Sequence, residues 1–121
     1  MNEKVLVVDD NKVGLEILIR RLKSLGYVAS STCEAAEVIT KLKSGNFQLL
    51  ILDLLMPEID GFEIARQVKS DDELRNVKII AYSAGSLSDL DKAKKAGCDE
   101  VCLKDGNTKG LLKLVEKLTT A

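Results

Sequence analysis

The chain has 121 residues, of which 45% are hydrophobic and 31% charged. This length accommodates one domain with a full hydrophobic core, and the composition is that of a globular rather than a disordered protein. Its 18 basic and 19 acidic residues leave a net charge of −1, which argues against a broad surface for nucleic acid or for membranes.

The apolar run at residues 5–8 ends in Asp9-Asp10 and is too short for a secretion signal. No apolar stretch approaches the roughly 20 residues that a membrane-spanning helix needs. We therefore expect a soluble, cytoplasmic protein whose three cysteines are reduced structural thiols. Because histidine is absent, a phosphohistidine or an imidazole base would have to come from another molecule.

Short aliphatic runs alternate along the chain with segments in which apolar residues recur at helical spacing. In order, the first half predicts a strand at VLVV from residue 5, a helix through Leu15, Leu18, Leu22 and Leu25, a strand at YVAS from residue 27, a helix around Val38 and Leu42, and a strand at LLIL from residue 49. The second half predicts a helix around Ile64 and Val68, a strand at IIAY from residue 79, a helix around Leu90 and Ala93, a strand at VCL from residue 101, and a helix through Leu111, Leu114, Val115 and Leu118. Turn or helix-stop residues fall between these elements at Gly26, Gly45, Gly97 and Gly106.

Five strands alternating with five helices predict an α/β fold, with a parallel sheet covered by helices on both faces. We expect a single domain over residues 1–121, built as a flavodoxin-like, doubly wound sheet with strand order 2-1-3-4-5. Because crossovers between parallel strands are right-handed, every strand ends at the same edge of the sheet, where such folds bind their ligands.

Polar side chains stand at four of the five predicted strand ends: Asp9 and Asp10 at the first, Asp53 at the third, Ser83 at the fourth and Lys104 at the fifth. In the expected strand order these four ends are neighbours. Two carboxylates about 4 Å apart repel by about 4 kcal/mol at an effective dielectric near 20, so three of them need a cation or raised pKa values. A divalent cation such as Mg²⁺ together with a lysine suits a phosphate group, which a carboxylate can accept covalently.

Each of these residues also has a plainer interpretation. Asp9 and Asp10 could end a strand and cap the next helix, and the Asp-Gly pair at residues 60–61 is expected to be a simple turn. Ser83 alone could be a loop hydroxyl, and Lys104 alone a solvated surface charge. Their joint occurrence at successive strand ends favours one common site.

The chain resembles a response-regulator receiver domain of two-component signalling along essentially its whole length. The resemblance is carried by VLVVDDN at residues 5–11, DLLMPEIDGFE at 53–63, AYSA at 81–84 and AGCDEVCLK at 96–104. It implies that Asp53 accepts a phosphoryl group from a histidine on a sensor kinase or a histidine phosphotransfer protein.

The resemblance also assigns roles to the residues around this acceptor. Asp10 and Asp53 would bind Mg²⁺ (or Mn²⁺) directly, together with the backbone carbonyl of Leu55, and Asp9 would act largely through water. Lys104 would pair with a phosphoryl oxygen. Metal and lysine would then supply the alignment and charge neutralisation that phosphoryl transfer needs.

Ser83 would hydrogen-bond another phosphoryl oxygen and draw its loop inward, which shifts the population of the surface at residues 86–119 toward binding an unknown downstream protein. The balanced charge leads us to expect no nucleic acid or membrane partner. The chain would catalyse only its own phosphorylation and dephosphorylation, so it is not expected to be an enzyme toward other molecules. Because Leu55 offers no hydrogen bond to a hydrolytic water, we predict that its dephosphorylation is slow.

Two positions depart from the family pattern. Val101 stands where the family usually has an aromatic residue, so a coupled movement of hydroxyl and ring is in question. Asp105 stands where the family has a proline after the lysine. Since a cis bond before a non-proline residue costs about 3 kcal/mol, we expect a trans bond there and a displaced Lys104 or a reshaped loop.

The first predicted helix is more apolar than a core-facing stripe requires, because its hydrophobic residues cover an arc of about 200° where a little over 100° suffices. We interpret Leu15 and Ile19, beside Gly14, as a docking surface for the partner's helical bundle. A broad internal packing face is the alternative.

Three other functions remain open from the residues alone. A flavin-binding electron carrier would need a phosphate loop where DDNKVG places two acids, and a haloacid-dehalogenase-type phosphatase would need an Asp-x-Asp arrangement after the first strand. The third is a degenerate receiver that acts as an interaction module without phosphorylation. The chain would be either a stand-alone regulator or a piece of a larger protein.

Overall fold

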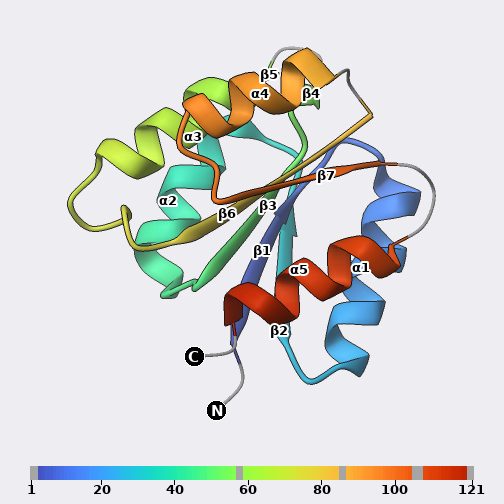
Figure 1. The fold of residues 1–121 in the computed structure, drawn as a ribbon. Helices are drawn as coiled ribbons and strands as arrows, with labels where there is room; N and C mark the ends of the chain where they lie inside the picture. The colour runs from blue at the N-terminus through green and yellow to red at the C-terminus, as the bar shows by residue number, and fades with distance from the viewer. Residues whose placement is uncertain (1–2, 57–58, 85–86, 105–107, 120–121) are drawn as a thin grey trace.

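The computed structural model describes residues 3–56, 59–84, 87–104 and 108–119. Its centre is a five-stranded parallel sheet between two layers of helices (Figure 1). The strands are β1 (Lys4–Val8), β2 (Val28–Thr32), β3 (Leu49–Leu52), β6 (Lys78–Ser83) and β7 (Glu100–Leu103), in the spatial order β2-β1-β3-β6-β7. Counted over these five strands, the order is 2-1-3-4-5, so the predicted topology is confirmed.

Five helices connect the strands in the described parts of the chain: α1 (Lys12–Ser24), α2 (Ala35–Gly45), α3 (Gly61–Ser70), α4 (Leu87–Lys95) and α5 (Lys109–Thr119). Helices α1 and α5 lie on one face of the sheet, and α2, α3 and α4 lie on the other (Figure 1). None of these helices combines the length and the apolar character that crossing a bilayer requires.

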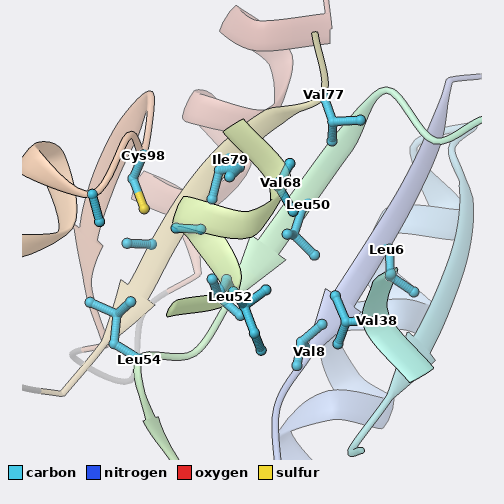
Figure 2. Close-up of a cluster of buried hydrophobic side chains, with 14 of the residues drawn as sticks. Leu6, Val8, Val38, Leu50, Leu52, Leu54, Val68, Val77, Ile79 and Cys98 are labelled. Atoms are coloured by element: carbon cyan, nitrogen blue, oxygen red, sulfur yellow. The ribbon is translucent and has the colours of Figure 1, made fainter. Parts of the chain in front are cut away.

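The sheet separates two hydrophobic clusters, because successive side chains of a strand point to opposite faces. On one face, residues such as Leu6, Val8, Leu50 and Leu52 pack against Val38 of α2 and Val68 of α3; this set is called the α2–α4 cluster (Figure 2). On the other face is the α1/α5 cluster, in which strand residues Val5, Val7, Leu49, Ile51, Ile80 and Tyr82 meet Leu15, Leu18 and Leu22 of α1 and Leu111 and Val115 of α5.

Short polar residues fix where the helices begin and end. Asn11 caps α1, since its side chain accepts a hydrogen bond from the backbone N–H of Gly14. Asn46 follows α2 in the left-handed conformation, with φ of 53°, so this residue and not Gly45 turns the chain. The predicted turns at Gly26 and Gly97 are confirmed by their φ angles of 97° and 109°; Gly106 lies outside the described residues.

The segment after β3 differs from the prediction. Residues of β4 (Leu55–Met56) pair antiparallel with those of β5 (Ile59–Asp60), a two-residue pairing too short to leave a sequence period. The Asp-Gly pair expected as a simple turn instead starts α3, because the Asp60 carboxylate accepts hydrogen bonds from the backbone N–H groups of Phe62 and Glu63. The helix therefore begins directly behind the end of β3.

The parallel register brings the strand ends together. Val8 is paired with Leu52, and the N–H of Asp53 donates to the carbonyl of Val8, so Asp9 and Asp53 leave the sheet side by side. On the next two strands, the N–H of Lys104 donates to the carbonyl of Ser83 at 2.7 Å. The polar residues at the ends of β1, β3, β6 and β7 thus lie along one edge, as predicted from the right-handed crossovers.

Candidate functional site

The three predicted carboxylates form one cluster at this edge. Asp9 and Asp10 follow β1, Asp53 follows β3, and a carboxylate oxygen from each lies within 4.8 Å of the other two. Asp9 and Asp53 are each only 5% exposed, whereas Asp10 is exposed to solvent. Asp53 therefore lies at the end of its strand, as the sequence predicts, and its side chain is enclosed by its neighbours.

Backbone groups orient two of these side chains. One oxygen of Asp9, Oδ1, accepts a hydrogen bond from the N–H of Asn11 at 3.0 Å. In the same way, Oδ1 of Asp53 accepts from the N–H of Leu55 at 3.1 Å. Because each carboxylate is held by the turn that follows its strand, its second oxygen has a fixed direction.

Lys104 lies against the second oxygens. Its Nζ is 2.6 Å from Oδ2 of Asp9 and 3.5 Å from Oδ2 of Asp53. The side chain of Lys104 is 24% exposed, so water screens these ion pairs less than it screens a pair on the open surface. The lysine at the end of β7 is therefore part of the carboxylate cluster, as the sequence predicts.

The pKa directions show how this charge is shared. Burial raises the pKa of Asp53, and the Asp9 charge adds to the increase; the Leu55 N–H and the Lys104 ammonium offset it only in part. Burial alone would lower the pKa of Lys104, but its hydrogen bond to Asp9 and the two negative charges outweigh burial and raise it. Because Asp9 and Asp53 share the single ammonium of Lys104, the positive charge near Asp53 does not fully offset its burial.

The donor set fits a hard divalent cation. Clustered carboxylate oxygens are the ligands that Mg²⁺ and Mn²⁺ take in proteins, and a cation would offset both the burial of Asp53, which is the main cause of its raised pKa, and its repulsion by Asp9. Leu55, the predicted source of a carbonyl ligand, directly follows the loop that carries Asp53, and its side chain is 50% exposed.

Ser83 lies at the end of β6, where the sequence places it, and is fully buried. Strand β6 pairs with β3 through Leu52 and Ala81, so Ser83 stands on the strand next to that of Asp53. The segment that follows Ala84, at residues 85–86, and the expected trans bond before Asp105 both lie outside the described residues. Val101 packs against the α2–α4 cluster.

The three docking residues predicted on α1 are not arranged as expected. Leu15 is only 8% exposed and belongs to the α1/α5 cluster, and Ile19 is half-buried against the same cluster. Gly14 is half-buried beside the capping Asn11. The apolar residues of α1 and its C-cap do reach solvent, but they do so at Val13, Ile17 and Leu25, which are 69%, 46% and 58% exposed. The spacing of apolar residues in the sequence gives the width of the apolar arc on α1. It does not show which side of that arc is buried against the rest of the protein.

Two residues at the site escaped the sequence interpretation. The ring of Tyr82 lies under the ammonium of Lys104, with 5.6 Å from Nζ to the ring centroid. Gly61 lies against the backbone of the loop that carries Asp53, because a Cβ there would stand 3.0 Å from the carbonyl oxygen of Asp53. The alternation of strand β6 could have indicated Tyr82, whereas nothing in the sequence reveals the approach of Gly61.

Comparison with known proteins agrees with this geometry. The family model for the response regulator receiver domain matches residues 5–116. Among curated proteins, the polar-differentiation response regulator DivK of Brucella anthropi is 27% identical over 100 residues, which span 82% of this chain and 81% of that protein.

Solved structures show the same fold. The response regulator TrrA of Thermotoga maritima, crystallised in complex with Mg²⁺-BeF, is 36% identical, with a TM-score of 0.84 over 96% of this chain and 98% of its own. A signal receiver domain from Bermanella marisrubri, at 24% identity, superposes with a TM-score of 0.91 over 99% of this chain and 100% of its own.

Proposed function

This chain belongs to the response regulator receiver domain family, and on that premise we propose that it accepts a phosphoryl group on Asp53. The observation that carries the proposal is the cluster itself. Three carboxylates and one ammonium converge on a single point at the sheet edge, and the central carboxylate is held in one orientation with too little positive charge around it. Such a site is suited to a group that brings negative oxygens together with a cation.

In the proposed reaction, an oxygen of Asp53 attacks the phosphorus of a phosphohistidine on a partner protein. A new O–P bond forms while the P–N bond breaks, and the imidazole of the partner leaves with the electron pair of that bond. Lys104 already lies 3.5 Å from Asp53, so its ammonium is placed to stabilise the negative charge of the transferred oxygens.

A Mg²⁺ ion held by Asp9, Asp10, Asp53 and the carbonyl of Leu55 is part of the proposal. When bound, it would neutralise phosphoryl oxygens. The clustering of the carboxylate oxygens within 4.8 Å supports this donor set, and the relative crystallised with Mg²⁺-BeF, TrrA, is consistent with it.

The proposed output is a change in the surface formed by residues 86–119, of which α4, β7 and α5 are described. Ser83, buried at the end of β6, is the hydroxyl that would bind the new phosphoryl group and draw its loop inward. The downstream partner is then a protein that prefers this shifted surface.

For the phosphodonor, we propose docking on α1 close to Asp53. The exposed apolar side chains of Val13 and Ile17 replace Leu15 in this role, because Leu15 is committed to the core. The proposed donor is a sensor histidine kinase or a histidine phosphotransfer protein, and we propose that the chain meets it in the cytoplasm. The proposed chemistry acts only on the chain's own Asp53, so we propose no catalysis on other molecules.

The decisive experiment is intact-protein mass spectrometry after incubation with acetyl phosphate and Mg²⁺. We expect the mass gain of one phosphoryl group, its loss in the Asp53→Asn variant, and its suppression when EDTA removes the metal. If the wild-type chain gains no phosphoryl group under these conditions, the proposal is wrong and a phosphorylation-independent interaction module takes its place.

A further inference from the structure

Lys104 has a third neighbour besides the two carboxylates that bind its ammonium. Its Nζ lies over the ring of Tyr82, 5.6 Å from the centroid. An ammonium within about 6 Å of an aromatic ring centroid is attracted by the negative charge of the ring face, and the attraction strengthens when the pair is withdrawn from water. Tyr82 is only 6% exposed, and the Lys104 side chain is 24% exposed, so this pair is largely withdrawn.

Tyr82 also connects Lys104 to one particular side of the molecule. Consecutive residues of a strand point to opposite faces, so the ring of Tyr82 and the hydroxyl of Ser83 leave β6 in opposite directions. The ring belongs to the α1/α5 cluster, next to Cys102 in the sheet register and with Leu18 of α1 and Leu111 of α5 in the same cluster. Val101, by contrast, packs with the α2–α4 cluster.

We propose that Tyr82 is a positioning residue for Lys104, which deepens and rests on the proposed phosphoryl transfer to Asp53. A lysine side chain has four rotatable bonds, and the two carboxylates hold the ammonium unequally, at 2.6 Å from Asp9 and 3.5 Å from Asp53. The ring of Tyr82 attracts the ammonium of Lys104 and keeps it beside Asp53 before the reaction. Preorganisation of this kind reduces the rearrangement needed when charge develops on the transferred oxygens.

The same contact gives phosphorylation a route to the α1/α5 face. When the ammonium moves toward a phosphoryl group on Asp53, its position over the Tyr82 ring changes, and the environment of a residue inside the α1/α5 cluster changes with it. This route is separate from the one through Ser83, because the two side chains leave β6 on opposite faces. Both faces of the sheet therefore respond to the modification.

The test compares acetyl phosphate labelling rates in three variants, measured by mass spectrometry at saturating Mg²⁺. Tyr82→Leu should slow labelling roughly threefold to tenfold, because it removes the attraction between the ring and the ammonium. Tyr82→Phe keeps the ring and should restore a rate near wild type. Tyr27→Leu is the matched control, because Tyr27 packs against the same cluster and should leave the rate unchanged.

A double-mutant cycle with Lys104→Met distinguishes positioning from general damage to the core. If Tyr82 acts through the lysine, adding Tyr82→Leu to Lys104→Met should cause no further loss of rate. Independent, multiplying losses would overturn the proposal, and so would a Tyr82→Phe variant as slow as Tyr82→Leu. Equal labelling rates for Tyr82→Leu and wild type would overturn the positioning role of Tyr82 but not the phosphorylation of Asp53. A wild-type chain that is not labelled at all would overturn both the positioning role and the phosphorylation.

A spectroscopic measurement keeps the test independent of how well Tyr82→Leu folds. The chain has two tyrosines and no tryptophan, so the Tyr27→Phe variant leaves Tyr82 as its only strong fluorophore. We expect its emission to change on addition of acetyl phosphate and Mg²⁺, and not when Asp53→Asn or Lys104→Met is also present. The proposal is overturned if the emission does not change on phosphorylation, or if it changes equally in the Lys104→Met variant.

Discussion

Replacing Gly61 by alanine should destabilise the protein, although alanine is the better helix former. A Cβ at this position would stand 2.9 Å from Cα of Leu54 and 3.0 Å from the carbonyl oxygen of Asp53. Both atoms belong to the backbone, so relief of this contact requires that α3 or the loop that carries Asp53 move. Overpacking of this kind costs about 1–3 kcal/mol, against a stability of about 5–15 kcal/mol for an ordinary domain.

The control is the same substitution at Gly14, for which the opposite sign is expected. There the nearest atom to a new Cβ is the side-chain nitrogen of Asn11 at 3.5 Å, an ordinary contact, and the position lies inside α1. Alanine in a helix interior is about 0.5–1 kcal/mol more favourable than glycine. Gly14→Ala should therefore stabilise the chain while Gly61→Ala destabilises it.

Urea unfolding followed by circular dichroism measures both changes, and thermal unfolding should move by about 3–5 °C per kcal/mol for a domain of this size. Labelling by acetyl phosphate should also slow in Gly61→Ala, because the displaced backbone is that of Asp53. If Gly61→Ala is as stable as wild type, or gains as much stability as Gly14→Ala, the close approach between α3 and the loop that carries Asp53 does not exist.

Two further predictions concern charge at the site, a third concerns loss of the phosphoryl group, and a fourth concerns the thiols. Burial raises the folded-state pKa of Asp53, so the folded protein binds the Asp53 proton more tightly than the unfolded chain does, and it loses stability as pH rises through that pKa. Asp53→Asn should therefore raise the urea midpoint at neutral pH without Mg²⁺. In acid, where Asp53 is protonated in the wild type, this gain should vanish. Lys104→Met should slow phosphorylation yet tighten Mg²⁺ binding roughly tenfold by calorimetry, since it removes a competing cation; unchanged affinity would contradict the shared-charge account. Leu55→Asn should speed loss of the phosphoryl group about threefold to tenfold, the effect of one added hydrogen bond to water, and equal half-lives would refute it. Burial raises the pKa of Cys98 to about 11, so iodoacetamide at pH 8 should alkylate the exposed Cys33 far ahead of it by peptide mass spectrometry.

The sheet could be predicted because its strands appear in the sequence as short aliphatic runs. A run such as LLIL at residues 49–52 is buried on both faces, and a parallel sheet between two helical layers is the fold that buries such runs. The convergence of Asp9, Asp53 and Lys104 followed from topology alone, because it depends only on which residue comes directly after each strand.

What could not be predicted depends on contacts between distant elements. The spacing of apolar residues gives the angular width of the arc on α1, but the burial of Leu15 depends on the packing of α1 against the sheet. The pairing of two residues in β4 with two in β5 is too short to produce a period. The ring of Tyr82 meets Lys104 only because β6 and β7 are neighbours, a contact between residues that the chain separates by a whole helix.

The division of the interior by the sheet has a consequence for how such a chain diverges over evolutionary time. Substitutions behind α1 and α5 touch a different set of neighbours from those behind α2, α3 and α4, so their effects on folding should be close to additive. One half can therefore drift, acquiring a new partner preference on its helices, without compensating changes in the other half. The strands of the sheet are common to both halves, so substitutions there would affect both.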